Sequence, residues 1–139
     1  YWQSVQVKYI EKYGDDEHHA TIAIAQEIHA SPEILETIDA VGFHNWQKVK
    51  DDNEWIHKIA SYADSRVTPY GVAPLDVRLA DARKRYENRS HTGDDMREIL
   101  YACIHEIESQ IFSHSKITPN DITDASIAET IEAVKNFEI

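Results

Sequence analysis

The sequence has little glycine, proline and cysteine, and it lacks a long apolar run. Four glycines and four prolines among 139 residues disfavour a turn-rich sandwich or barrel. The single cysteine, Cys103, excludes an internal disulfide and a metal site built from cysteines. No run approaches the roughly 18 apolar residues of a membrane-spanning helix, and no signal-peptide pattern stands at the start. We therefore expect a protein of the reducing cytoplasm that makes no contact with a membrane.

Positive charge is also scarce. The chain has 14 lysines and arginines against 25 aspartates and glutamates, which gives a net charge of −11. Such a field repels the phosphate backbone of nucleic acids, so general DNA or RNA binding is not expected. A small phosphorylated molecule can bind only where a metal ion or a local basic cluster overrides the net charge.

Helical periodicity is what the sequence does contain, along nearly its whole length. Apolar residues recur every three or four positions between breaks marked by glycine, proline and capping side chains. We expect loops at residues 45–52 and 68–74. The prediction is an all-α bundle of six or seven helices in one domain spanning residues 1–139. The expected helices cover residues 1–13, 17–30, 32–41, 53–67, 74–89, 94–113 and 125–137.

Asp64 is the most informative polar residue. It follows Ile56 by eight positions and Ala60 by four, so it shares their apolar face of the predicted helix. The inward residues of that helix are expected to include Trp55 and Ile59. A buried carboxylate is costly unless it is paired or bound to a cation. The alternatives are a salt bridge to an arginine on the next helix and a role as a metal ligand.

Histidines supply the second group of candidates. His44 stands at the end of a predicted helix, beyond Gly42, where it can interact with the helix dipole or serve as a metal ligand. His18 and His19 are adjacent, so they point about 100° apart on a helix and cannot easily share one ion. The alternative for both is a solvated helix start.

Basic residues crowd into the stretch just after Asp64. One interpretation is a solvated helix face, because acidic residues are interleaved with them. The other is that Arg66, next to Asp64, reaches a phosphate. The members of the cluster are Arg66, Arg78, Arg83, Lys84, Arg85 and Arg89.

Several of these segments resemble a known family. Residues 62–67 read Tyr-Ala-Asp-Ser-Arg-Val, residues 71–75 read Gly-Val-Ala-Pro-Leu, and Arg78 and Lys84-Arg85-Tyr86 follow. These pieces resemble the C-terminal half of an HD-domain protein, a family of all-helical, metal-dependent phosphohydrolases named for a His-Asp doublet. Residues 17–23 and 41–45 resemble the family's histidine segments, in the family's order. The resemblance covers roughly residues 9–89.

The resemblance implies a function and a site. A divalent metal (Mn, Fe, Ni, Co, Zn or Mg) would be held by His19, His44 and Asp64, and the family register selects His19 over His18. Arg66 would hold the phosphate of a small phosphorylated substrate, for example a nucleotide. Residues 1–89 would form the HD-like core, with the helices of residues 90–139 packed on it.

The sequence also departs from the family pattern. A first histidine and the His-Asp doublet lie upstream of the His19 segment in the family, and this sequence contains no His-Asp dipeptide. Either the chain shown lacks an N-terminal part, as a start at Tyr1 allows, or it is a degenerate member. The leading hypothesis is a phosphohydrolase acting on a phosphate ester. The alternative is a non-catalytic regulatory or interaction module on the same scaffold, and a homodimer remains open for either.

Overall fold

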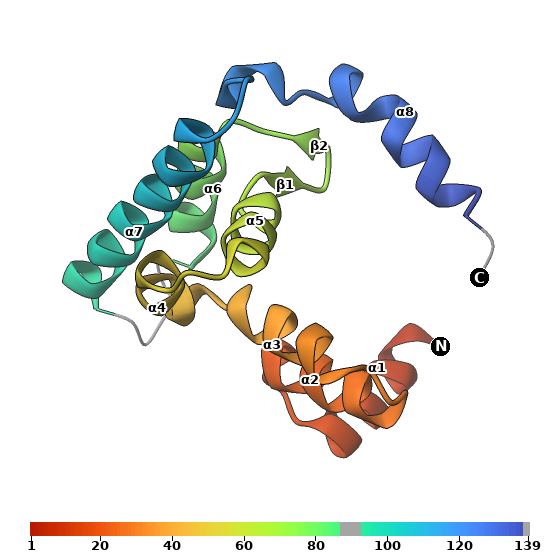
Figure 1. Ribbon diagram of the computed structural model, residues 1–139. Coiled ribbons are helices and arrows are strands. Elements are labelled where there is room, and N and C mark those ends of the chain that lie inside the picture. The colour runs from red at the N-terminus through yellow and green to blue at the C-terminus, as the bar shows by residue number, and fades with distance from the viewer. Residues whose placement is uncertain (87–92, 138–139) are drawn as a thin grey trace.

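The computed structural model describes residues 1–86 and 93–137, and these are almost entirely helical (Figure 1). The all-α prediction is confirmed, with one small two-stranded hairpin in addition. The first half of the chain forms α1 (Trp2–Tyr13), α2 (Glu17–Glu27), α3 (Pro32–Ala40), the 3-10 helix η1 (Phe43–Asn45), α4 (Trp46–Asp51) and α5 (Trp55–Asp64). The remainder forms β1 (Val67–Thr68), β2 (Gly71–Val72), α6 (Leu75–Tyr86), α7 (Asp94–Ser113), the 3-10 helix η2 (Pro119–Asp121) and α8 (Asp124–Lys135).

Capping side chains start the early helices where the sequence predicts. The Asp16 carboxylate accepts a hydrogen bond of 2.8 Å from the backbone N–H of His19 at the start of α2. Ser31 caps α3 in the same way, and Pro32 occupies the first turn, where its missing N–H costs nothing. The predicted continuation of α6 to Arg89 lies outside the described residues.

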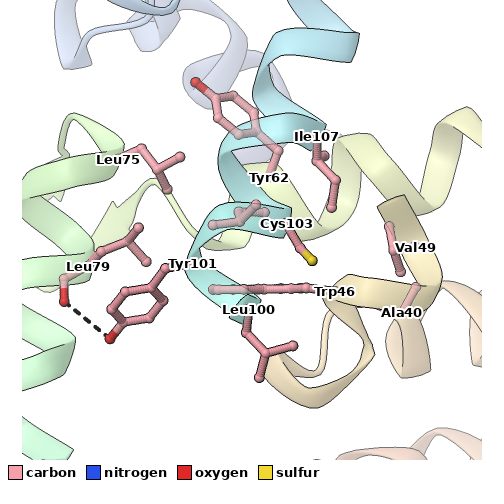
Figure 2. Close-up of a cluster of buried hydrophobic side chains, with 11 residues drawn as sticks. Ala40, Trp46, Val49, Tyr62, Leu75, Leu79, Leu100, Tyr101, Cys103 and Ile107 are labelled. Carbon is pink, nitrogen blue, oxygen red and sulfur yellow. Dashed lines mark hydrogen bonds between the residues drawn. The ribbon is translucent and has the colours of Figure 1, made fainter. Parts of the chain in front are cut away.

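The hydrophobic core is centred on α7. Ile104 and Ile107 of this helix are fully buried, and α4, α5 and α6 supply the other residues of the cluster together with Ala40 of α3 (Figures 1 and 2). The predicted inward residues Leu100, Cys103 and Ile107 are confirmed, whereas Ile99 is exposed. The other buried apolar residues of the cluster are Ala40, Trp46, Val49, Tyr62, Leu75, Leu79 and Tyr101.

The predicted loop at residues 45–52 is wrong, because this segment forms α4. Trp46 and Val49 lie one turn apart and are both buried in the core cluster, where α4 packs on α7. Two apolar residues among polar neighbours are a weak periodic signal, so packing decides this short helix. It raises the count among the described residues to eight α-helices.

The predicted inward face of α5 is also wrong. Trp55, Ile56 and Ile59 are 42–55% exposed, whereas Lys58 and Ser61 are buried. Buried polar groups are tolerated here because each is hydrogen-bonded. The Lys58 ammonium donates to the carbonyl oxygens of Val49 (2.9 Å) and Lys50 (2.7 Å), and Ser61 Oγ donates to Ala40 O (2.8 Å). These donors satisfy carbonyl oxygens near the ends of α3 and α4. The face of α5 that carries Ile56 and Asp64 is the one exposed to solvent.

Helix α8 is attached to the remainder of the fold chiefly at its start. Asp124 Oδ1 accepts a hydrogen bond of 2.8 Å from the backbone N–H of Val72, and the helix then leads away from the core (Figure 1). The predicted apolar stripe of this helix is not buried, since Ile131 and Val134 are exposed and Ile127 is half-buried. None of the described helices has the length and hydropathy needed to cross a membrane.

Candidate functional site

A pocket of about 320 Å³ opens where η1 and α4 meet α5, α6 and α7. Its lining combines two arginines with one carboxylate and three aromatic rings. Because these side chains come from five segments, no single motif in the sequence marks the site. The polar residues that line it are Asp64, Ser65, Arg78 and Arg97.

Arg78 and Arg97 bring two positive charges to this pocket. Arg78 on α6 is anchored by its Nε, which donates to the backbone carbonyl of Val67 at 2.9 Å. Its Nη1 lies 3.9 Å from a carboxylate oxygen of Asp81, which is the outer limit of an ion pair. Arg97 on α7 is buried, and its Nη1 lies 3.4 Å from the exposed carboxylate of Asp94. Each guanidinium group therefore has an acidic neighbour on its own helix.

Asp64 is the carboxylate among the described residues that line the pocket. Asp64 is exposed as a whole residue, whereas its carboxyl group is partly withdrawn from solvent. That partial burial raises the pKa of Asp64, and the positive charge of Arg78 opposes the rise without cancelling it. The salt bridge that the sequence allowed between Asp64 and an arginine on the next helix is present only as this electrostatic attraction, because no ion pair within 4 Å joins Asp64 to Arg78.

Three aromatic rings form the apolar wall. The Phe43 ring lies edge-to-face with Trp46 at a centroid distance of 4.8 Å and with Tyr101 at 6.1 Å. Trp46 is 6% exposed, and its indole Nε1 has no hydrogen-bond partner among the described residues. Tyr101 donates to the carbonyl oxygen of Leu79 at 3.4 Å, which fixes its ring against α6 (Figure 2).

Arg66 does not line this pocket with Arg78. Its guanidinium is buried and donates to the Tyr62 hydroxyl and to three backbone carbonyl oxygens. Those carbonyls belong to Ala73 on the connection to α6 and to Pro119 and Ile122 around η2, the latter two at 3.2 Å. Arg66 therefore ties the β-hairpin and the α7–α8 connection to α5. This placement is at odds with the predicted role of Arg66 as a phosphate ligand.

The histidine helix places His18, rather than His19, next to His44. The two rings lie edge-to-face with centroids 5.4 Å apart, and His18 Nε2 is 3.3 Å from Asp39 Oδ1. Gly42 allows this contact, because a Cβ there would lie 3.0–3.1 Å from atoms of both rings. The His19 side chain is 77% exposed and lies 3.6 Å from Asp16 at the helix start.

The predicted metal ligands His19, His44 and Asp64 are not assembled. Throughout residues 1–86 and 93–137, no three histidine, cysteine, aspartate or glutamate side chains are grouped so that they could hold a metal ion. The residues present therefore do not fit the divalent metal that the resemblance implies. Metal binding by these three residues stays a prediction from the sequence.

Sequence reasoning missed Trp46 and Arg97. Arg97 precedes Leu100 by three positions and Ile104 by seven, so it is a charged residue on the apolar face of α7. The same argument that singled out Asp64 applies to it and could have found it. Trp46 carried no such signal, because its segment was expected to be a loop.

Comparison with protein-family models, with curated proteins and with solved structures gave no match for this chain. The function of the chain is therefore inferred from the pocket and its residues.

Proposed function

We propose that this chain binds a small phosphate ester in the pocket lined by Arg78 and Arg97. The observation that carries the proposal is the local charge. Two guanidinium groups and one carboxylate line the pocket, in a chain whose total charge is −11. A local basic cluster of this kind is the condition under which an acidic protein can hold a phosphorylated molecule.

Guanidinium groups suit phosphate better than ammonium groups do. Their planar N–H donors match two oxygens of a phosphate at once, and they remain charged at all ordinary pH values. A phosphate monoester carries about 1.5 to 2 negative charges at pH 7, which is comparable to the charge of two arginines. Arg78 is held at its Nε by the Val67 carbonyl oxygen, and its side chain lines the pocket where the ester would bind.

Asp64 is compatible with an anionic ligand because its pKa is raised. Partial burial raises the pKa of this carboxyl, so it takes up a proton at a higher pH than a free aspartate does. A phosphate next to it favours the protonated form further. The neutral carboxyl group can donate a hydrogen bond to a phosphate oxygen.

Hydrolysis of the same ester is the second candidate function. It is favoured by one observation, namely that Asp64, which the HD-domain resemblance makes a metal ligand, lines the same pocket as the two arginines. Release of inorganic phosphate from phenyl phosphate after Mn²⁺ is added would support this candidate. Binding without release, with or without Mn²⁺, would support the non-catalytic module.

Titration calorimetry with cyclohexyl phosphate tests the proposed binding. We expect measurable binding to the full chain and none of cyclohexanol, because the charge supplies the attraction. Arg78→Gln should weaken binding by about tenfold or more, the effect of losing a charged hydrogen bond. Arg85→Gln is the matched control, since Arg85 also stands on α6 but pairs with Asp81 outside the pocket lining.

The proposal is wrong if cyclohexyl phosphate does not bind the wild-type chain, or if Arg78→Gln binds it as well as Arg85→Gln does. Far-ultraviolet circular dichroism of both variants establishes that the helices are intact before the affinities are compared.

A further inference from the structure

We infer that the ligand of this pocket is a phosphate monoester of a planar aromatic ring, and that the ring carries a hydrogen-bond acceptor. The inference rests on the proposed phosphate binding and specifies the other half of the ligand. Three observations carry it: the aromatic wall, the unpartnered indole N–H and the size of the cavity.

The aromatic wall favours a flat partner. Phe43 stands nearly perpendicular to both neighbouring rings, with interplanar angles of 73° to Trp46 and 74° to Tyr101. All three rings contribute to the lining of the pocket. An aromatic ring gains from such contacts through its quadrupole, in addition to the burial that any apolar group gains. A saturated ring of similar size gains the burial alone.

Trp46 adds a requirement for an acceptor. Its indole Nε1 is the buried side-chain nitrogen that lacks a hydrogen-bond partner within the described part of the chain. Buried donors are nearly always paired in folded proteins, because leaving one unpaired costs the whole of its lost hydration. Trp46 lines the pocket, but its Nε1 has almost no accessible surface, so the indole ring must turn before a bound ligand can give this N–H an acceptor. A nitrogen or oxygen on the ligand's ring supplies one.

The cavity sets the size of the ligand. At about 320 Å³ it lies at the lower end of the range for small-molecule pockets. The polar residues Arg78, Arg97 and Asp64 and the aromatic residues line one continuous space, so the phosphate and the ring must belong to one compact molecule. This composition fits an ester with one or two rings better than a long or branched one.

Matched ligands test the flat ring. Phenyl phosphate and cyclohexyl phosphate are nearly the same size, and above about pH 8 both are dianions, because the second pKa of a phosphate monoester is about 6. We expect the wild-type chain to bind phenyl phosphate about three- to tenfold more tightly, the range that aromatic contacts contribute beyond burial. Phe43→Leu should reduce this preference to less than about twofold while cyclohexyl phosphate still binds. Phe112→Leu is the control, because Phe112 packs against Tyr62 outside the pocket lining and should keep the preference.

A second pair of ligands tests the acceptor. 3-Pyridyl phosphate differs from phenyl phosphate by one ring nitrogen that can accept a hydrogen bond. We expect it to bind the wild-type chain more tightly than phenyl phosphate does and to bind Trp46→Phe no more tightly. The wild-type comparison stands on its own if the Trp46 variant does not fold.

The outcomes separate the inference from the proposed function. If phenyl and cyclohexyl phosphate bind the wild-type chain equally, the flat-ring inference is overturned and phosphate binding stands. If phenyl phosphate and 3-pyridyl phosphate bind the wild-type chain equally, the inference that the ring carries a hydrogen-bond acceptor is overturned. If no phosphate ester binds, the proposed function fails and the inference fails with it.

Discussion

Three cationic side chains among the described residues are almost fully buried: Lys58, Arg66 and Arg97. A buried cation must be compensated by acceptors, because its hydration has been lost. Lys58 and Arg66 meet this need with backbone carbonyl oxygens and a tyrosine hydroxyl, and they hold segments together. Arg97, which is ion-paired with Asp94 at 3.4 Å, also lines the pocket. Position, rather than residue type, therefore separates structural arginines from the arginines of the candidate site.

Arg66→Ala should destabilise the chain strongly. The substitution removes the guanidinium group that donates to the Tyr62 hydroxyl and to three carbonyl oxygens. These acceptors then lose a hydrogen-bond donor. We expect the free energy of unfolding, measured in urea, to fall by about 2–4 kcal/mol. Arg85→Ala, on the exposed side of α6, should change it by less than about 0.5 kcal/mol. Equal effects of the two substitutions would contradict the structural role of Arg66.

Asp64→Asn should change how stability depends on pH. Burial raises the pKa of Asp64 in the folded chain, so the folded state keeps this proton to a higher pH than the unfolded state does. The free energy of unfolding contributed by Asp64 therefore falls as the pH rises from the ordinary carboxyl pKa, about 3.9, through the raised folded value. Asparagine has no carboxyl proton to release, so the variant does not lose this stability as the pH rises. The substitution also removes the negative charge that attracts Arg78.

Thermal melting of both proteins at low and neutral pH checks this prediction. The melting temperature of Asp64→Asn relative to wild type should be higher at pH 7 than at pH 3. Asp15→Asn, at an exposed residue outside the pocket, is measured in parallel as the control for loss of one carboxylate. A difference between Asp64→Asn and wild type that is the same at both pH values would argue against a raised pKa.

At the scale of elements, α5 and α8 show how an apolar stripe can predict a helix without predicting its buried face. Both helices form where the periodicity of the sequence expects them. In α5 the hydrogen bonds of Lys58 and Ser61 turn the opposite face inward, and in α8 few other segments lie close enough to cover Ile131 and Val134. Periodicity fixes which residues share a face, whereas packing selects the face that is buried.

Removal of residues 127–139 should leave the remaining fold nearly intact. The contact of α8 with the hairpin is made by Asp124, which this truncation keeps. We expect the loss of most of the α8 signal in circular dichroism and a melting temperature lowered by no more than about 4 °C, the shift for about 1 kcal/mol. A fall of more than about 10 °C would mean that α8 contributes to the core stability.

At the scale of the whole molecule, the arrangement of the chain separates the predicted metal ligands. His19 is exposed at the start of α2 and Asp64 ends α5, and they form no metal-binding group with His44 in the described part of the fold. We therefore expect less than stoichiometric metal in protein purified without chelator, by elemental analysis. The melting temperature should be the same with EDTA as with Mn²⁺, because a ligand that binds the folded state raises it. A stoichiometric metal ion would reverse this view and favour the phosphohydrolase.

The sequence by itself determined the helical class of this protein, the limits of most helices and the acidic background against which any phosphate site must work. These properties depend on local spacing, capping residues and total charge, and they can be read without knowing which segments meet. Asp64 was identifiable for the same reason, since a carboxylate on an apolar face is a local anomaly. The HD-domain resemblance stays a hypothesis that the predictions above can test.

Only the tertiary structure decided which polar groups meet. Helix α4 forms from a segment without a strong helical period of apolar residues, because Trp46 and Val49 pack against apolar residues of α7. Arg66 donates hydrogen bonds to backbone carbonyl oxygens, whereas Arg78 and Arg97 line the pocket. These outcomes depend on contacts between residues far apart in the sequence, such as Arg66 and Ile122, which are 56 positions apart. Local patterns carry no information about such distances, and the cost of burying a charge can be judged only once its partners are known.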